Sequence, residues 1–413
     1  MRHVVGVFVL VVAASSVDAR VLSTRCDRMQ RRLETMEQRA FDRCGSTDGC
    51  TPKSESKIGR RRTRFVDLCV RLNEVQVLGT HNSYHVQPIP PLFDALLEVT
   101  DAFLAWEYTR DPLDVQFATQ GVRQIELDVW ADPDGGLFAE RRGLEIIGLD
   151  PVSGLPELDQ PGFKVFHVQD IDYGTTCLTF VQCIQTVKAW SDANPGHLPL
   201  MVLIEAKDDR LPNFQGFTFA VPVPLGTPEF DDLDAEIRSV FPPEQLITPD
   251  DVRGDLATLE DAVLIHGWPT IGESRGRVLF ALDNGGAKRD AYRAGHPSLA
   301  GRVLFTDASP GNDDAAFVKR NDPFAADIPA LVASGYIVRT RTDVDTYEAR
   351  DNDTGPRDTA IASGAQYVST DYPVPNPDFG TGYFVEIPDG HPGRCNPINA
   401  PPGCRSTALE PAP

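Results

Sequence analysis

Beyond residue 74 the chain alternates short apolar runs with longer mixed segments. Each run has five or six mostly apolar residues, and the run at 200–204 contains no polar residue at all. A strand that is buried on both faces of a parallel sheet has this pattern. The strands predicted in this way are residues 75–79, 124–129, 163–168, 200–204, 277–282, 302–306, 336–340 and 366–370.

The number and spacing of these strands predict an α/β fold. Eight strands separated by crossover-length segments indicate a (β/α)8 TIM-type barrel. An open doubly wound sheet usually has a glycine-rich phosphate loop after its first strand, whereas Gly79 is followed here by Thr80 and His81. The barrel would occupy residues 74–375, and residues 376–413, rich in Pro, Gly and Asn, would form an irregular C-terminal tail.

The first nineteen residues have the features of a secretory signal peptide. A basic start at 1–3 precedes an apolar stretch at 4–14 and then small residues up to Ala19. The apolar stretch is too short to span a bilayer. We therefore expect cleavage after Ala19 and a secreted, extracellular protein. A buried N-terminal strand is the alternative.

Residues 20–73 differ from the rest in being rich in cysteine and arginine, and we expect them to form an N-terminal extension. A helix is predicted over residues 24–41, followed by a Gly/Ser/Lys loop that leads to the basic run at 60–64. Such a basic patch could hold an anionic membrane surface. We favour the simpler interpretation, a solvated lead-in tied by disulfides.

The eight cysteines fit disulfides better than a metal site. Export favours disulfides, and the close spacing within the last four cysteines predicts two local bridges, Cys177 with Cys183 and Cys395 with Cys404. A zinc site is disfavoured because no Cys-x-x-Cys pair occurs. The sequence leaves open the pairing among the first four, which are Cys26, Cys44, Cys50 and Cys69.

The charge of the chain narrows the choice of partners. A formal net charge of −21 and a pI near 4.7 argue against nucleic acid, because a phosphate backbone needs a basic face. No feature of the sequence indicates an obligate protein partner. An acidic chain can instead carry a carboxylate-rich site for a hard cation.

Polar side chains gather where the predicted strands end, and in a parallel barrel these ends meet at one mouth. Glu126 and Asp128 are two residues apart on a strand, so both side chains point to the same face. With Leu127 and Val129 facing the helices, that face is the barrel interior. Glu205 ends the fourth predicted strand and would join them.

Three buried carboxylates are costly unless a cation lies between them. With the Asn82 amide they form an all-oxygen ligand set, which suits calcium or magnesium rather than zinc, and calcium is the better match outside the cell. His81 and His167 remain at the same rim, suited to acid–base chemistry at a phosphoryl group. Each residue alone is more often structural, but their conjunction favours a metal-dependent phosphodiesterase.

Taken in order, these residues resemble a known family. Gly-Thr-His-Asn-Ser-Tyr at 79–84, Glu-Leu-Asp at 126–128, His167 and Glu205 closely resemble the catalytic X region of calcium-dependent phosphoinositide-specific phospholipase C, a PLC-like phosphodiesterase. The secreted bacterial-type branch is the most similar, with further matches at 106–108 and 131–136, and the resemblance covers roughly residues 74–373. It assigns Ca²⁺ binding to Asn82, Glu126, Asp128 and Glu205, and catalysis to His81 and His167.

The resemblance also implies a reaction. The inositol 2-hydroxyl, bound to calcium, would attack phosphorus, so that phosphatidylinositol in a membrane surface yields diacylglycerol and a cyclic inositol phosphate. Glu126 or Glu205 would take the hydroxyl proton. His81 would stabilise the crowded phosphorane-like state, and His167 would protonate the departing diacylglycerol oxygen.

The chain departs from the eukaryotic members on the fifth strand. Those enzymes have lysines there that grip extra inositol phosphates, whereas this strand has alanine and aspartate. We therefore expect unphosphorylated phosphatidylinositol, or a glycosylated relative, as the substrate. The further site residues expected are Asp283 as an additional calcium ligand, Lys207 at the phosphate, and Arg339 or Arg341 at the head group.

Two other functions are compatible with parts of this pattern. A glycerophosphodiester phosphodiesterase or sphingomyelinase-D-like barrel shares the Glu-x-Asp and two histidines, but it tends to have Arg, or Ala and Gly, where this chain has Asn82. A catalytically inactive lipid-binding barrel would be expected to lack one member of the set, and none is missing.

Apolar residues follow the first catalytic loop at helix-like spacing. They could form an interfacial helix that enters the lipid. We favour the alternative, that they are the inner stripe of the first crossover helix of the barrel. The residues are Leu92, Phe93, Leu96, Leu97, Phe103, Leu104 and Trp106.

Overall fold

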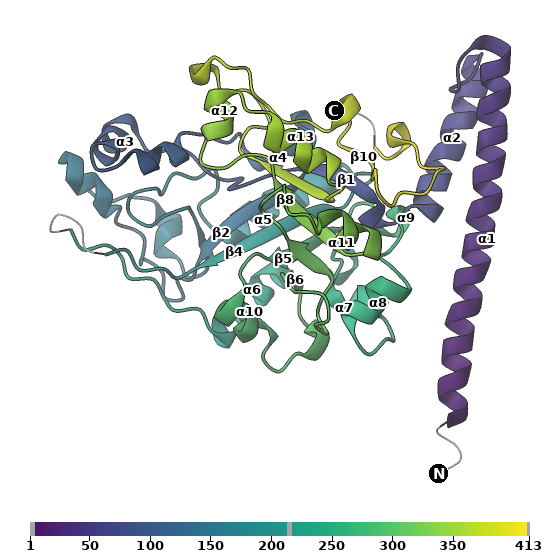
Figure 1. The fold of residues 1–413 in the computed structure, drawn as a ribbon. Helices are drawn as coiled ribbons and strands as arrows, with labels where there is room; N and C mark the ends of the chain where they lie inside the picture. The colour runs from purple at the N-terminus through teal and green to yellow at the C-terminus, as the bar shows by residue number, and fades with distance from the viewer. Residues whose placement is uncertain (1–4, 213–216, 411–413) are drawn as a thin grey trace.

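The computed structural model describes residues 5–212 and 217–410, with the backbone alone for residues 5–23 (Figure 1). Eight parallel strands form one sheet in the order β6-β5-β4-β2-β1-β9-β8-β7, and a parallel bridge between Asp307 and Phe317 joins its two ends. This nearly closed barrel confirms the predicted TIM-type fold. The strands are β1 (Val75–Thr80), β2 (Val122–Trp130), β4 (Leu200–Lys207), β5 (Val278–Leu282), β6 (Leu304–Thr306), β7 (Phe317–Lys319), β8 (Ile337–Arg341) and β9 (Tyr367–Thr370).

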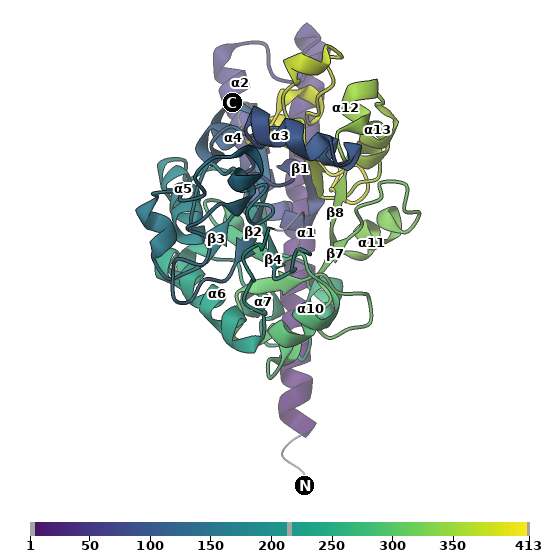
Figure 2. The ribbon, with the colours of Figure 1, turned by 90° about the vertical axis from the view of Figure 1, so that its left-hand side faces the viewer.

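Helices between the strands surround the barrel (Figures 1 and 2). The strands pack tightly because both of their faces are covered: every residue of β2 and of β5 is buried. The helices that follow the strands are α4 (Leu113–Thr119), α5 (Phe180–Ala193), α6 (Thr227–Val240), α7 (Pro249–Arg253), α8 (Leu259–Ile265), α9 (Ile271–Ser274), α10 (Gly286–Arg293), α11 (Ile328–Ser334), α12 (Tyr347–Asp351) and α13 (Gly355–Ala362).

One predicted barrel strand is wrong and another was missed. In the segment 163–168 only Lys164 and Val165 form a strand, β3, which pairs antiparallel with the end of β2 and lies outside the barrel order. The eighth barrel strand is instead β7. At three residues, ending in Lys319, β7 is too short for its hydrophobic pattern to stand out. Because β3 pairs with Val129 and Trp130, it still carries His167 to the mouth.

The predicted first crossover helix is also in a different place. Helix α3 (Pro90–Leu97) packs on the mouth of the barrel, and the helix that packs on β2 is α4. The buried residues Leu92 and Leu96 form a separate apolar cluster with Ile171 and Phe219, which come from the loops after β3 and β4. The preferred interpretation of this apolar stripe was therefore wrong, because loop side chains cover it instead of barrel strands.

The N-terminal extension forms two helices, α1 (Val5–Cys44) and α2 (Pro52–Cys69), joined by the Cys26–Cys69 disulfide, with Cys44–Cys50 closing the turn between them. The loop predicted before residue 60 is thus largely helical. Thr51 and Pro52 begin α2 with a capping box. Residues 1–4 of the predicted signal peptide lie outside the described residues. Figures 1 and 2 place α1 at the opposite end of the molecule from α3.

The C-terminal tail packs against the barrel at the end where β1 begins. Its described part, residues 376–410, contains one short strand, β10 (Gly393–Cys395), which pairs antiparallel with β1. The predicted local disulfides Cys177–Cys183 and Cys395–Cys404 are both present. Among the described residues, no helix is both long enough and apolar enough to cross a membrane.

Candidate active site

Three carboxylates meet inside the mouth of the barrel. Glu126 and Asp128 project from β2, and Glu205 is the cross-strand partner of Asp128 on the adjacent β4. Oxygen atoms of all three lie within 4.8 Å of one another. Arg339 donates to Glu126 Oε2 at 2.6 Å from β8, across the barrel, so Glu126 faces the interior as predicted.

The oxygen atoms of this group are poorly satisfied by the protein itself. Both carboxylate oxygens of Asp128 and the amide oxygen of Asn82 are buried without a hydrogen-bond partner, although Lys207 Nζ lies within ion-pair distance of Asp128 Oδ2. Asn82 has φ of 41°, a left-handed conformation that asparagine tolerates, and its Nδ2 donates to the Tyr108 hydroxyl at 3.1 Å. Unpaired buried oxygens are costly. They fit a hard cation such as calcium, which prefers oxygen ligands.

The raised pKa values of Glu126 and Asp128 also indicate that these acids lack a cation to balance their charge. Burial, together with the charges of Asp283 and Glu205, raises the pKa of Glu126 to about 7 despite Arg339. Burial and the neighbouring carboxylates Glu205 and Glu126 raise the pKa of Asp128 well above its usual range. A bound divalent cation would favour the ionised form of both groups.

Lys207 lies against the same acids. Its Nζ is 3.3 Å from Asp128 Oδ2 and 3.2 Å from Glu205 Oε1. Although burial lowers it, these two carboxylates raise the pKa of Lys207 above its usual range. The lysine therefore stays charged and supplies part of the positive charge that the acid group requires.

His81 is fixed by a carboxylate at one side of the group. Its Nδ1 is 2.9 Å from Asp371 Oδ1, and its Nε2 is 3.7 Å from Glu126 Oε1. Arg110 and Arg341 donate to the Asp371 carboxylate at 2.6 and 2.8 Å. Burial and the charge of Arg341 lower the pKa of His81 to about 3, so the imidazole is neutral at neutral pH.

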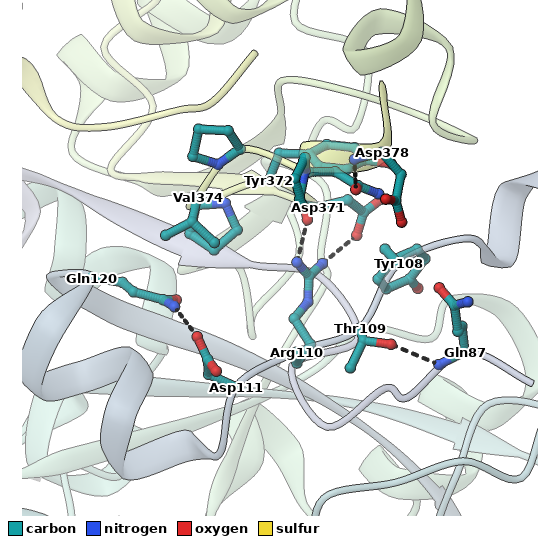
Figure 3. Close-up of a pocket in the computed structure, with 14 residues that line it drawn as sticks. Gln87, Tyr108, Thr109, Arg110, Asp111, Gln120, Asp371, Tyr372, Val374 and Asp378 are labelled. Carbon is teal, nitrogen blue, oxygen red and sulfur yellow. Dashed lines mark hydrogen bonds and ion pairs between the residues drawn. The ribbon is translucent and has the colours of Figure 1, made fainter. Parts of the chain in front are cut away.

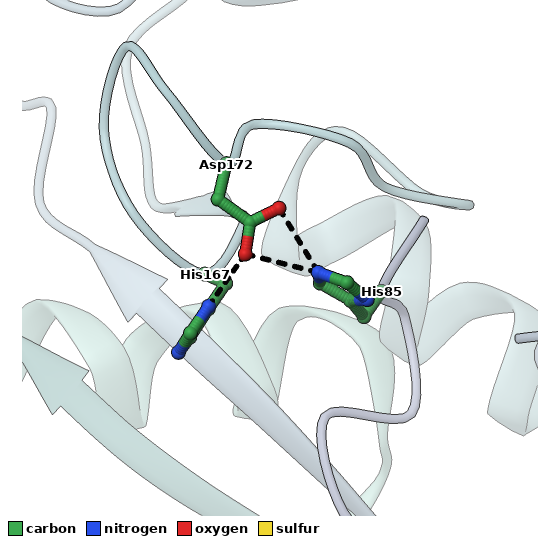
Figure 4. A group of neighbouring side chains, drawn as sticks. All are labelled: His85, His167 and Asp172. Atoms are coloured by element: carbon green, nitrogen blue, oxygen red, sulfur yellow. Dashed lines mark hydrogen bonds and ion pairs between the residues drawn. The ribbon is translucent and has the colours of Figure 1, made fainter. Parts of the chain in front are cut away.

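His167 is fixed by a second carboxylate, Asp172 (Figure 4). Its Nδ1 is 2.6 Å from Asp172 Oδ2, and the same carboxylate lies within 3.0 Å of Nε2 of the buried His85. The Trp106 and His167 rings pack in a T-shaped arrangement, with 5.5 Å between their centroids. The Nδ1 contact leaves His167 Nε2 as the nitrogen available for a substrate.

The other predicted site residues are paired with side chains of the protein itself. Asp283 forms an ion pair with Lys319 at 2.5 Å and is not among the three acids whose oxygens cluster. Arg339 is almost fully buried, and it holds Glu126 and Asn321. Arg341 is bound to Asp371.

Sequence reasoning missed the two carboxylates that hold the histidines, and it missed His85. Asp371 directly follows the last barrel strand, a position at the mouth that could have marked it. Asp172 lies five residues after His167 in an irregular loop that returns on itself, where Val168 and Asp172 form a bridge. Because that pairing depends on the loop conformation, no spacing in the sequence reveals it.

A cavity of about 470 Å³ lies beside Asp371 (Figure 3). Its floor contains the Arg110–Asp371 pair, and its outer wall comes from the segment 372–378 that follows β9. None of the three clustered acids lines it. Arg110 also donates to the His81 carbonyl oxygen, so the same arginine supports both the backbone of His81 and the carboxylate that holds its ring.

Within the described residues a second group could also hold a metal, His85, His167 and Asp172. Its two imidazoles suit a transition metal, whereas the group of Glu126, Asp128 and Glu205 is all oxygen. A parallel barrel with clustered carboxylates and two supported histidines at the carboxyl ends of its strands defines the class of a metal-dependent phosphodiesterase.

The sequence profile of a family described as "Phosphoinositide phospholipase C, Ca2+-dependent" matches residues 70–397. The chain therefore belongs to this family of calcium-dependent enzymes that cleave phosphatidylinositol lipids as phosphodiesterases. A comparison with curated proteins gives no significant match.

Two solved bacterial enzymes are similar in structure. The calcium-dependent phosphoinositol-specific phospholipase C of Pseudomonas sp. is 17% identical, with 80% of this chain and 96% of that chain covered and a TM-score of 0.49. The Ca²⁺-dependent phosphatidylinositol-specific phospholipase C of Streptomyces antibioticus is 18% identical, with 76% and 97% covered and a TM-score of 0.45.

Proposed function

We propose that the barrel mouth is the catalytic centre, with calcium held by Asn82, Glu126, Asp128 and Glu205 between the two catalytic histidines. One observation carries this proposal. The three acids bring carboxylate oxygens within 4.8 Å of one another, the oxygens of Asp128 and of the Asn82 amide are buried without a hydrogen-bond partner, and His81 and His167 are each fixed by a carboxylate of their own. When bound there, calcium would lower the pKa of the attacking hydroxyl and offset the charge on the phosphate.

His81 or Glu126 takes the proton of the inositol 2-hydroxyl in this proposal. With Nδ1–H donated to Asp371, the neutral His81 presents the lone pair of Nε2, and Arg339 leaves Glu126 Oε1 free. These two acceptor atoms are 3.7 Å apart, beyond hydrogen-bond distance, so the proton goes to one of them and is not shared. When His81 takes the proton, the resulting imidazolium faces the phosphoryl oxygen, which suits the stabilising role expected of His81.

His167 gives a proton to the departing glycerol oxygen. The Asp172 carboxylate accepts its Nδ1–H, which fixes the ring and leaves Nε2 to carry the donated proton. Attack by the 2-hydroxyl and loss of diacylglycerol leave a cyclic inositol phosphate, which water can open in the reverse proton sequence.

The substrate we propose is phosphatidylinositol without extra phosphates, or a glycosylated relative. Strand β5 offers Ala281 at the relevant face, and Asp283 beyond it is paired with Lys319. Lys207, whose Nζ already lies at the acids, is the cation placed to meet the single phosphate. Arg339 is buried and acts through Glu126 rather than on the head group.

The mouth is also the side that would face a membrane. Of the exposed large apolar side chains among the described residues, most lie in the loops that follow the barrel strands. Exposed apolar side chains on the loops that follow the strands of a lipid-cleaving barrel suit contact with an interface. The residues of this apolar rim are Ile89, Val99, Leu149, Val152, Val221, Phe324, Val344, Tyr347 and Val374.

We also propose that the protein is secreted. Residues 1–19 would be removed as a signal peptide, leaving the extension (20–73), the catalytic barrel (74–375) and the tail (376–413). The support is the N-terminal pattern together with four disulfides, which persist in oxidising compartments.

Phosphorus NMR of phosphatidylinositol vesicles tests the reaction. With enzyme and calcium we expect the signal of a five-membered cyclic phosphate to appear, and to be absent when a chelator is added first. Release of glycerophosphoinositol or phosphatidate instead would contradict the proposal. Glu126→Gln is the matched control, because it keeps the shape of the site and removes one ligand charge.

A further inference from the structure

Helices α1 and α2 form a basic helix pair (residues 24–69) in an acidic protein. These residues contain twelve of the 39 basic residues and only seven of the 60 acidic ones, so the pair carries a net charge of +5 in a chain whose net charge is −21. The match to the phospholipase family begins at residue 70, so the basic helix pair lies outside it. Its charges take no part in the proposed reaction.

Almost all of these cations face the solvent. Eleven of the twelve are exposed, and no ion pair joins any of the eleven to an acid in the part of the chain that the structure describes. The twelfth, Arg62, is buried and pairs with Glu37 at 2.8 Å and with Asp48 at 2.6 Å. Asp67 pairs with Arg275, after α9, at 2.8 Å. The exposed cations are Arg25, Arg28, Arg31, Arg32, Arg39, Arg43, Lys53, Lys57, Arg60, Arg61 and Arg64.

The exposed cations form a stripe along each helix. Successive members are three, four or seven residues apart, a spacing that places them on one face of a helix. At 1.5 Å per residue the stripes are about 27 Å long on α1 and about 17 Å long on α2, with close to one cation per turn. The α1 stripe consists of Arg25, Arg28, Arg32, Arg39 and Arg43, and the α2 stripe consists of Lys53, Lys57, Arg60 and Arg64.

Both stripes are held in place before any ligand binds. Two disulfides join the helices, one at each end of α2. The buried Arg62 links the helices through Glu37, and Arg405 of the C-terminal tail binds the same carboxylate at 2.7 Å. A surface that is already ordered loses little conformational entropy on binding, which favours the capture of an extended ligand.

A membrane does not fit this surface. Phe41 is the only exposed large apolar side chain that the structure describes in residues 24–69, whereas an interfacial helix needs an apolar face. Helix α1 also lies at the opposite end of the molecule from α3 (Figures 1 and 2). The membrane that supplies the lipid at the barrel mouth is therefore out of reach of α1.

The acidic remainder of the chain disfavours a wide anionic ligand. A duplex nucleic acid or a second copy of this chain is broad enough to approach the barrel, whose negative charge would repel it. At physiological salt, charges more than about 8 Å apart are largely screened from one another. A single thin polymer chain that lies along α1 would therefore interact mainly with the basic helix pair.

We propose that the two stripes bind a linear acidic polysaccharide with about one carboxylate or sulfate per sugar residue. Nine of the eleven exposed cations are arginine, whose planar guanidinium donates two parallel hydrogen bonds to such an anion. One cation per helical turn of 5.4 Å suits an anionic group that recurs once per sugar. The choice of a polysaccharide rests on the proposed secretion, because these polymers occur outside the cell.

Calorimetry with polygalacturonate, which has one carboxylate on each sugar, tests the proposal on the whole protein. We expect binding at about 0.15 M salt that weakens as salt is added, because the contacts are ionic. The fully methyl-esterified polymer has the same backbone without the charge, and it should not bind. Equal binding of both polymers would overturn the proposal.

Charge reversal locates the binding surface. Arg28→Glu with Arg32→Glu changes two neighbours of the α1 stripe and should weaken binding of polygalacturonate at least tenfold. Lys57→Glu with Arg60→Glu makes the same change on α2, with the same expected result. The matched control, Lys188→Glu with Arg238→Glu, alters the net charge equally on α5 and α6 and should bind like wild type. Wild-type affinity in both stripe variants would overturn the proposal.

Three other results would also overturn it by identifying a different occupant. Binding of phosphatidylglycerol vesicles that both stripe variants lose would assign the surface to a membrane. Tighter binding of duplex DNA than of polygalacturonate would assign it to nucleic acid. Salt-sensitive dimers in sedimentation velocity, lost in both stripe variants, would assign it to a second copy of the chain. None of these measurements needs catalysis, so a failure to cleave phosphatidylinositol would defeat only the proposed function.

Discussion

Charged side chains in the barrel mouth are held by partners that determine their protonation. The Asp371 carboxylate illustrates this, since His81, Arg110 and Arg341 all bind it. Burial alone would raise its pKa, but these three hold the pKa well below its usual range. The charges at the rim of the site are therefore fixed by ion pairs. At its centre, the negative charge of Glu126, Asp128 and Glu205 is only partly balanced by Arg339 and Lys207.

Lys207 should compete with calcium for the acids. Removing its charge beside Asp128 and Glu205 should strengthen calcium binding at least tenfold, because even in a medium as polar as water a charge at this distance is worth about 1 kcal/mol, and more at an intermediate dielectric. Isothermal titration calorimetry of Lys207→Met measures this. Lys288→Met is the control, because Lys288 pairs with Asp208 outside the acid group. Weaker calcium binding in Lys207→Met would contradict the assignment.

His167 should matter for turnover and not for the metal. His167→Ala should lower kcat about 10²- to 10⁴-fold, the usual size of general acid–base catalysis, while calcium affinity stays within twofold. Initial rates on vesicles and calorimetry check the two halves. His266→Ala, just after α8, should behave as wild type. Wild-type turnover in His167→Ala would show that its role is misassigned.

Much of the site follows from strand ends and side-chain alternation. Glu126, Asp128 and Glu205 could be predicted because a period of two puts them on one face of buried strands. Asp172 and His85 could not, because their pairing depends on a loop after an antiparallel ribbon. The roles of Arg339 and Asp283 also needed the fold, since their partners Glu126 and Lys319 come from other strands.

At the level of elements, the length of a strand determined whether the strand could be predicted from the sequence. Strands of five or more residues such as β4 have a clear apolar pattern, whereas β7 has three residues, of which the last is Lys319, and Arg320 follows it. For α3, the sequence correctly predicted a buried apolar stripe, but it did not predict that loop side chains would bury that stripe. Periodicity shows that a face is buried and not which element buries it.

The turn into β1 should respond to pH through Glu74. Its carboxylate caps the backbone N–H of Arg71 at 2.8 Å, and burial raises its pKa from 4.5 to about 7. A raised carboxyl pKa means that the unfolded state ionises first, so this contribution to stability is full below pH 4.5 and is lost as pH rises through 7.

Glu74→Gln should remove that loss. Its stability relative to wild type should increase between pH 5 and pH 8, by at most ~3 kcal/mol for a pKa shift of this size. Urea unfolding at the two pH values measures the difference. Glu244→Gln, at an exposed position, should show no pH-dependent difference. A difference for Glu74→Gln that is the same at both pH values would refute this account.

For the molecule as a whole, the apolar rim should govern binding to lipid and not the chemistry. Phe324→Ser with Tyr347→Ser should weaken binding to phosphatidylinositol vesicles at least tenfold, given ~1.5–3 kcal/mol for each large side chain buried. Cleavage of a water-soluble inositol phosphodiester should be unchanged. Vesicle sedimentation and a soluble-substrate assay separate the two.

The matched control lies at the other end of the barrel. Leu264 and Ile265 are equally apolar and exposed, but they end α8 away from the mouth. The double variant Leu264→Ser with Ile265→Ser should bind vesicles like wild type. Equal losses in both double variants would mean that no particular face meets the membrane.

The N-terminal helix pair has a practical consequence. Because α1 lies at the far end of the molecule from α3 and is linked to α2 by Cys26–Cys69, an attachment at this end projects away from the mouth. Anchored to a bead or chip through α1, the enzyme would keep its opening turned toward any liposome passing over the support.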